Sequence, residues 1–270
     1  MSESLKRVLV SVVGIPIIVG SIYSGGVYFI LVLSAIALLS QNEYYNLAKL
    51  NGFRVDKILG MASGLIILLL IYLEGEEFIL HFLLTATLLI LIVEIFKKEA
   101  SPLNSSAALI FGIIYPTLMI GTLYPLRNMG GSGGELGLNI VFALITGVWV
   151  CDIAAYYIGK AIGKHKLLEK VSPKKTWEGS IAGFSAALIF LTGLKYLGFL
   201  PAIPSYQTVI AIAVIAGVGG QLGDLFESLL KRDAGLKDSG KFLPGHGGVL
   251  DRFDALIFAA PMAYIYLNIV

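Results

Sequence analysis

The chain has 270 residues, of which 57% are hydrophobic and only 14% are charged. Soluble domains carry about 25% charged and about 45–50% apolar residues, so this composition excludes an ordinary soluble globular protein. A net charge of +2 gives no reason to expect a nucleic-acid partner, and one cysteine, Cys151, cannot form an intrachain disulfide.

The apolar residues fall in runs of about 17–22, long enough to cross a hydrocarbon core of about 30 Å as helices. The runs do not alternate apolar and polar residues, which disfavours a β-barrel. We therefore expect an all-α, polytopic integral membrane protein with about nine transmembrane helices. The predicted spans are Val8–Tyr23, Val27–Ser40, Ile58–Leu73, Phe78–Phe96, Ala107–Leu126, Leu138–Ile158, Ser180–Leu197, Thr208–Leu225 and Leu250–Ile269.

The basic residues predict the orientation. With a cytoplasmic N-terminus, most of the 20 lysines and arginines fall on the cytoplasmic side, as expected for insertion into the inner (cytoplasmic) membrane. The two longest cytoplasmic loops then follow the sixth and eighth spans. We expect residues 1–136 to supply about five N-terminal spans, and residues 137–270 to form the catalytic region with both loops.

Acidic residues open the ninth span. Asp251 and Asp254 are three positions apart, so they share one face of a helix. Two carboxylates on one face suit a hard cation such as Mg²⁺. The alternative is a capping cluster at the helix N-terminus, with Arg252 as its counter-ion.

Two further acids lie within predicted spans. Asp224 shares a helical stripe with Ser228 and Lys231 in "GDLFESLLK", and Asp152 lies in "WVCDIAAYY". Intramembrane acids usually face a bundle interior or a water-filled cavity, which makes both functional candidates. The alternative for "GGQLGDL" is a packing face of small residues.

Both loops have a composition that suits phosphate. In "GLKDSGKFLPGHGG" the glycines and proline favour a shaped loop with exposed backbone N–H groups, and Lys237 and His246 add donors. In "SPKKTWEG" basic and hydroxyl groups precede a helix, whose N-terminal N–H groups favour an anion. The lysines there can also be read as contacts to anionic lipid headgroups. The candidates in this second loop are Ser172, Lys174, Lys175 and Thr176.

Taken together, acidic positions for divalent cations, lysine-rich loops and glycine-rich backbone meet at one membrane face. This combination fits phosphoryl or nucleotidyl transfer involving a lipid, because such reactions depend mainly on positioning and charge neutralisation. Paired metal ions about 3.5–4 Å apart could stabilise the attacking and leaving oxygens.

The stretch "ESLLKRDAGLKDSGKFLPGHGGVLDRFDAL" resembles the signature of the phosphatidate cytidylyltransferases, also called CDP-diacylglycerol synthases. "SPKKTWEG" and "GQLGDL" resemble two further blocks of that family. The positions that match the signature are Ser228, Lys231, Arg232, Lys237, Asp238, Pro244, His246, Gly247, Gly248, Asp251, Arg252 and Asp254.

The resemblance implies that CTP and phosphatidic acid give CDP-diacylglycerol and pyrophosphate, with Mg²⁺, in a membrane homodimer with a paired-metal site. The metal ligands it implies are Asp224, Asp251 and Asp254. The residues it implies for the CTP phosphates are Lys174, Lys175, Lys237 and His246. Those it implies near metal or lipid phosphate are Asp152, Lys231 and Arg232.

Three alternatives stay open. The nearest is a CTP-dependent lipid kinase, or a cytidylyltransferase for another lipid phosphate. A transporter or channel would spread its acids across the membrane, whereas these gather near one face. A structural scaffold leaves the glycine–histidine–aspartate loop unexplained.

Overall fold

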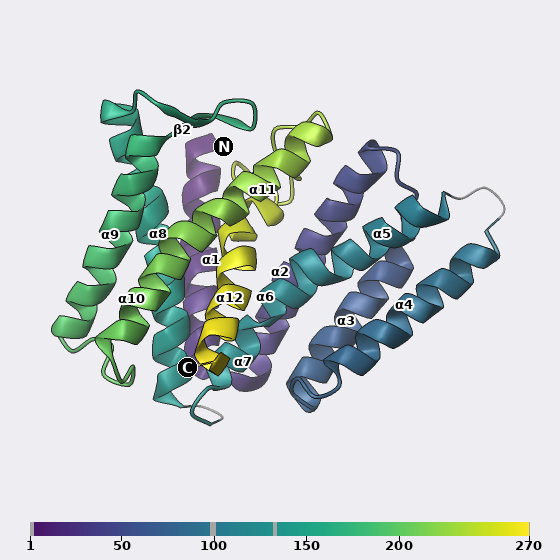
Figure 1. Cartoon of the computed structure of the whole chain (residues 1–270), viewed down its shortest axis with the longest axis horizontal. Coiled ribbons are helices and arrows are strands. Elements are labelled where there is room, and N and C mark those ends of the chain that lie inside the picture. Colours follow the sequence, from purple (N-terminus) through teal and green to yellow (C-terminus); the bar gives the residue numbers. More distant parts are fainter. Residues whose placement is uncertain (1–2, 98–100, 132–133, 270) are drawn as a thin grey trace. The chain divides into compact units, whose positions relative to one another are not determined.

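A computed structural model describes residues 3–97, 101–131 and 134–269, which are mostly helical (Figure 1). In the N-terminal half the helices are α1 (Glu3–Ser24), α2 (Gly26–Leu50), α3 (Lys57–Leu73), α4 (Ile79–Ile95), α5 (Pro102–Ile113), the π-helical turn η1 (Ile114–Leu118), α6 (Met119–Gly121) and α7 (Leu123–Asn128). The second half contains α8 (Glu135–Ile162), β1 (Lys166–Leu168), β2 (Ser172–Thr176), α9 (Trp177–Tyr196), α10 (Tyr206–Val214), η2 (Ile215–Gly219), α11 (Gly220–Asp233) and α12 (Leu250–Ile269).

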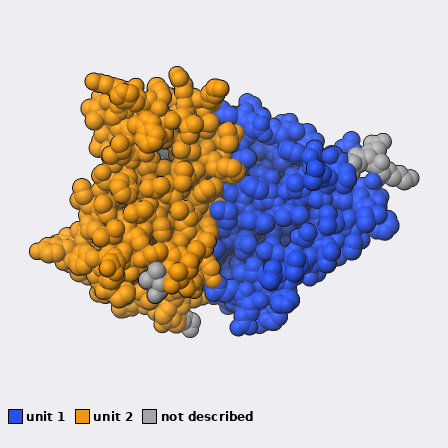
Figure 2. Space-filling view, in the orientation of Figure 1, with its two compact units in different colours: residues 1–125, 230–253 blue, residues 126–229, 254–270 orange. Residues whose placement is uncertain are grey.

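The chain divides into two compact units (Figure 2). Unit 1 contains residues 1–125 and 230–253, and unit 2 contains residues 126–229 and 254–270. The loop that follows α11 thus belongs with the N-terminal helices. This division into units does not show where the reaction takes place, so the expected catalytic role of residues 137–270 stays a prediction.

Tyr45 of α2 lies at the centre of unit 1. Its ring is fully buried, and its hydroxyl donates to the Leu109 carbonyl oxygen at 3.1 Å. Gly60 of α3 and Gly112 of α5 leave room for this ring, because a Cβ at either position would collide with it. Small residues thus let three apolar helices pack closely around one aromatic side chain.

Helices α8 and α9 pack side by side in unit 2 (Figure 1). Glycines allow the close approach: a Cβ on Gly179 would lie 2.7 Å from the Ala155 carbonyl oxygen, and one on Gly183 would lie 2.7 Å from that of Cys151. Cys151 is buried in this interface, as expected for a packing residue.

An antiparallel hairpin, β1–β2, connects α8 to α9, with Lys166 opposite Thr176 and Leu168 opposite Ser172. The all-α prediction omitted it, because the run of lysines gave no strand-like alternation. The hairpin ends where α9 begins, since the Thr176 hydroxyl accepts the Gly179 N–H at 3.2 Å and caps the helix.

The prediction of an α-helical membrane protein is confirmed. In the described part of the chain, five helical stretches are long and apolar enough to cross a membrane: Gly26–Leu50, Pro102–Asn128, Glu135–Ile162, Trp177–Tyr196 and Tyr206–Asp233. Shorter apolar helices occupy Val8–Ser24, Lys57–Leu73 and Ile79–Ile95. Helix α12 has the bounds predicted for the ninth span but is not among the five, and Asp251, Arg252 and Asp254 lie at its start.

Candidate active site

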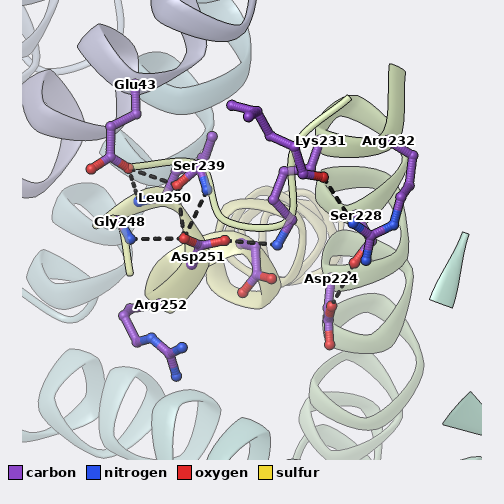
Figure 3. Close-up of polar contacts among 12 residues, drawn as sticks. Glu43, Asp224, Ser228, Lys231, Arg232, Ser239, Gly248, Leu250, Asp251 and Arg252 are labelled. Atoms are coloured by element: carbon purple, nitrogen blue, oxygen red, sulfur yellow. Dashed lines mark hydrogen bonds and ion pairs between the residues drawn. The ribbon is translucent and has the colours of Figure 1, made fainter. Parts of the chain in front are cut away.

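Asp251, the second residue of α12, is held on both sides of its carboxylate (Figure 3). Its Oδ2 accepts from Gly248 N at 2.8 Å, from Ser239 N at 2.9 Å and from the Ser239 hydroxyl at 3.0 Å. Its Oδ1 accepts from Lys231 Nζ at 2.7 Å. Two backbone N–H groups and a hydroxyl therefore fix Oδ2, while Oδ1 faces the Lys231 ammonium group.

Lys231 belongs to the last turn of α11, and its pairing corrects one expectation. The alternative interpretation of the α12 N-terminus made Arg252 the counter-ion of the acidic cluster. Instead Lys231 pairs with Asp251, and Arg252 Nε donates to the His246 carbonyl oxygen at 3.0 Å. The capping part of that interpretation holds, because Asp251 accepts the Gly248 N–H just before the helix begins.

The glycine-rich loop takes a shape that only glycine allows. Leu243 N donates to Gly247 O, and His246 N donates back to Leu243 O, each at 2.9 Å. Gly245 and Gly247 adopt φ angles of +78° and +86°, a region that residues with a Cβ rarely enter. A Cβ on Gly247 would also lie 2.8 Å from Asp251 Oδ2. The turn therefore brings backbone directly against the carboxylate.

Glu43 of α2 is a site residue that sequence reasoning missed. It is only 4% exposed. Its Oε1 accepts from Val249 N at 3.0 Å, and its Oε2 accepts from Leu250 N and the Ser239 hydroxyl, both at 2.8 Å (Figure 3). Glu43 thus binds the N–H groups that follow the glycine-rich loop, while Asp251 accepts from the loop N–H groups of Ser239 and Gly248.

A signal for Glu43 was present in the sequence. The predicted second span ended at Ser40, which assigned the polar run "QNEYYN" to a loop, whereas α2 continues to Leu50. Within this helix Gln41, Glu43 and Tyr45 are all buried. Buried polar groups need partners, so a polar run at the end of an apolar helix was evidence for a polar site.

A second carboxylate–lysine pair lies in unit 2. Asp224 Oδ2 lies 2.6 Å from Lys175 Nζ, and the Ser228 hydroxyl lies 3.4 Å from Asp224 Oδ1. Asp224 is on α11 and Lys175 on β2, so the structure joins two blocks that sequence analysis had singled out separately. Both side chains are partly exposed, at 34% and 27%. The Lys175 Nζ atom itself is nevertheless buried against the carboxylate.

Asp254, the other predicted metal ligand, is a buried residue of unit 2. Its Oδ1 accepts from Ala255 N at 2.8 Å. Its backbone lies against α11 at Gly223, where a Cβ would collide with the Asp254 carbonyl oxygen. Close packing of α11 on α12 thus fixes this residue.

The remaining candidates are spread over several elements. Arg232 is exposed and donates to the Leu236 carbonyl oxygen at 2.8 Å. His246 is half-buried in the glycine-rich turn, and Ser172 is half-buried where β2 begins. The candidates with exposed side chains are Asp152, Lys174 and Lys237.

Across the described ranges, no three His, Cys, Asp or Glu side chains are grouped closely enough to hold a metal ion. Each of Asp224 and Asp251 instead has a lysine ammonium within 2.7 Å. Each carboxylate therefore already faces a cation. Mg²⁺ is usually bound through one or two carboxylates together with substrate phosphates and waters, and single carboxylates of this kind fit that chemistry.

Comparison with known proteins places these features in a family. The model of the Cytidylyltransferase family matches residues 5–270. The phosphatidate cytidylyltransferase of Bacillus subtilis (strain 168) is 30% identical over 276 residues, which cover 99% of this chain and 98% of that protein. That of Staphylococcus aureus (strain COL) is 31% identical over 97% of this chain and 98% of its own length. The Brucella melitensis protein of the same name is 34% identical over 98% and 94%.

Proposed function

Because the chain belongs to the cytidylyltransferase family, we propose that it transfers the cytidylyl group of CTP to phosphatidic acid. The observation that carries this proposal is the match over nearly the whole length of relatives named phosphatidate cytidylyltransferase. A phosphate oxygen of phosphatidic acid attacks the α-phosphorus of CTP and forms a new O–P bond. The bond between the α-phosphorus and the bridging oxygen breaks, and pyrophosphate leaves. The products are CDP-diacylglycerol and pyrophosphate.

The attacking phosphate needs no strong general base. Its second pKa is about 6, as for other phosphomonoesters, so it is largely ionised at neutral pH. The main barrier is repulsion between two polyanions, which nearby positive charge offsets. We assign this role to lysines of both loops and of the last turn of α11, with His246 as a further donor. The lysines are Lys174, Lys175, Lys231 and Lys237.

We assign Mg²⁺ binding to Asp224 and Asp251, with Asp254 as a further ligand. When bound, Mg²⁺ neutralises phosphate charge and polarises the α-phosphorus. The donor set supports this assignment, because Asp251 keeps Oδ2 on protein donors and presents Oδ1 to a positive charge. Lys231 and Lys175, which contact these carboxylates, would bind phosphate oxygens beside them. Asp224 in unit 2 and Asp251 in unit 1 each offer one carboxylate for a cation.

Label transfer tests the reaction directly. Purified protein in mixed micelles is given phosphatidic acid and Mg²⁺, with CTP labelled at the α-phosphate in one tube and at the γ-phosphate in another. We expect label in lipid only from the α position, with pyrophosphate released. Label only from the γ position would identify a lipid kinase instead. No lipid label from either tube would contradict the proposal.

We further propose that the N-terminus and both loops face the cytoplasm, that the protein lies in the inner membrane, and that it is a homodimer. Lys170 is exposed in the turn of the hairpin, and the only natural cysteine, Cys151, is buried. In a Lys170→Cys variant, the new cysteine should react with an impermeant maleimide in inverted membrane vesicles and not in intact cells.

Native mass spectrometry tests the proposed homodimer, and a monomer mass at working concentration would overturn it.

A further inference from the structure

Glu43 places a carboxylate where three donors of one short segment converge. Ser239, Val249 and Leu250 all belong to the loop and helix start that carry Asp251, and all lie with Glu43 in unit 1. A buried carboxylate is costly unless it is paired or well hydrogen-bonded. An ionised carboxylate only accepts hydrogen bonds, and each of these three contacts brings a donor. The three donors therefore offset the cost of burying the Glu43 carboxylate.

Two of these donors are backbone N–H groups at the start of α12: Leu250 is its first residue, and Val249 directly precedes it. The N-terminal N–H groups of a helix lack partners within the helix and favour negative charge. Val249 and Leu250 give theirs to Glu43, while Gly248 gives its N–H to Asp251. Glu43 thus caps, from a different helix, the helix start on which Asp251 lies.

Ser239 links the two carboxylates. Its hydroxyl lies 2.8 Å from Glu43 Oε2 and 3.0 Å from Asp251 Oδ2. A hydroxyl carries one proton, so it can donate to only one of them at a time. The Ser239 N–H stays on Asp251 Oδ2 at 2.9 Å. A change at Glu43 therefore reaches Asp251 through one shared hydroxyl.

The glycines of this segment fit the same arrangement. A Cβ on Gly240 would collide with Glu43 Oε1, and a Cβ on Gly248 would collide with Glu43 Oε2 and the Ser239 hydroxyl. Neither glycine has a positive φ that would explain it by backbone conformation. The close approach of the loop to the Glu43 carboxylate explains both.

We propose that Glu43 is a positioning residue that holds Asp251 and its loop in the orientation that binds the cation. The proposal rests on the proposed function, in which Asp251 binds Mg²⁺. Groups that orient a metal ligand typically change metal affinity or activity by about 10–100-fold when they are replaced. Glu43 touches no substrate in this role, because it acts through Ser239 and the start of α12.

The central variant is Glu43→Gln, which keeps the shape of the side chain. Its amide nitrogen can only donate, so it must face a donor N–H group of Val249 or Leu250. We expect the Mg²⁺ concentration for half-maximal activity to rise about tenfold, with a smaller effect on the KM for phosphatidic acid. Amide hydrogen exchange in a peptide covering residues 239–251 should become faster.

Glu94→Gln is the matched control. Glu94, near the end of α4, is another buried acid of unit 1. It is 5% exposed and pairs with Lys97, just beyond the helix, at 2.6 Å. Its replacement should leave the Mg²⁺ dependence and the exchange of residues 239–251 unchanged. Equal shifts in both variants would assign the effect to loss of any buried acid and would overturn the proposal.

Ser239→Ala keeps the proposal testable if Glu43→Gln does not fold. It removes the shared hydroxyl but leaves the backbone N–H on Asp251, so the Mg²⁺ requirement should rise by less than in Glu43→Gln. In the double variant the two effects should be less than multiplicative, because part of the Glu43 effect passes through the Ser239 hydroxyl. Fully multiplicative effects would contradict the link.

A readout without turnover separates this inference from the reaction itself. Mg²⁺ alone should raise the Tm of the wild-type protein in detergent, and this shift should shrink in Glu43→Gln. If the wild type makes no CDP-diacylglycerol, the proposed function fails, yet the Mg²⁺ shift and hydrogen exchange still decide the role of Glu43. An unchanged Mg²⁺ shift together with unchanged exchange would overturn it.

Discussion

Lys231 Nζ lies 2.7 Å from Asp251 Oδ1, and the two side chains are only 11% and 5% exposed. Replacing one partner of such a pair leaves the other charge buried, at a cost of about 3–5 kcal/mol. The same contact holds the carboxylate to which we assign cation binding. Replacing Asp251 should therefore lower both the stability of the protein and its activity, and its variants must be designed to separate these two effects.

Asp251→Asn should lower turnover at least about a hundredfold, because a neutral amide replaces the charged ligand. It should also lower the Tm, since Lys231 loses its counter-ion. Adding Lys231→Met should recover much of the Tm without recovering activity. Asp233→Asn is the control, because Asp233 is exposed and accepts from Asn51 Nδ2 at 2.7 Å, away from the proposed metal ligands. Wild-type turnover in folded Asp251→Asn protein would refute the assignment.

Lys175→Gln should raise the KM for CTP by about tenfold while changing the stability by less than about 1 kcal/mol. The small stability effect follows because ion pairs between partly exposed side chains contribute little. Steady-state kinetics against CTP concentration and thermal unfolding supply the two values. Lys170→Gln, in the exposed turn of the same hairpin, should leave the KM unchanged. Equal KM changes in both variants would indicate general attraction by the positive hairpin.

Gly248→Ala should inactivate the protein and lower its Tm, because the added methyl group meets Glu43 and Ser239. Overpacking of this kind costs about 1–3 kcal/mol. Gly193→Ala in α9 is the matched control, since a Cβ there meets nothing within 4 Å. Alanine favours helix over glycine by up to about 1 kcal/mol, so that variant should be as stable as wild type or more so. An active, stable Gly248→Ala protein would contradict the close approach described for this loop.

Thr176→Ala separates capping from substrate binding. Loss of the helix cap should cost about 1 kcal/mol. If Thr176 also binds phosphate, as the sequence predicts, the KM for CTP should rise in the alanine variant and recover in Thr176→Ser. Ser205→Ala removes the equivalent cap of α10, where the hydroxyl accepts from Thr208 N at 3.1 Å. It should lower the Tm by a similar amount without any kinetic change.

Helix positions were predictable because hydrophobic length in a membrane is a strong local signal. The predicted ninth span and α12 share the bounds Leu250–Ile269, since the glycine-rich loop marks one end sharply. The candidate residues, whose roles stay predictions, were also singled out locally, from charges inside apolar runs. Their pairing was not, because Lys231 and Asp251 are 20 positions apart and no spacing rule joins them.

Glu43 was missed for a related reason. Hydropathy assigns a polar run at the end of a span to a loop, but in the fold that run continues α2 into a buried polar centre. The β1–β2 hairpin was missed because its short strands are largely exposed and carry no apolar alternation. In both cases the structure depends on contacts with a different helix or strand, which the local sequence pattern does not show.

The bond between Glu43 and Val249 joins residues 206 positions apart, which has a consequence for biogenesis. Synthesis proceeds at about 5–20 residues per second, so the acceptor on α2 exists for about 10–40 s before its donors are made. During that interval the nascent chain carries an unsatisfied acid in a largely apolar helix. A chain that terminates before Ser239 never makes the donors that bind the Glu43 carboxylate. Such fragments should be preferred substrates of membrane quality-control proteases, whereas full-length chains mask the acid once translation ends.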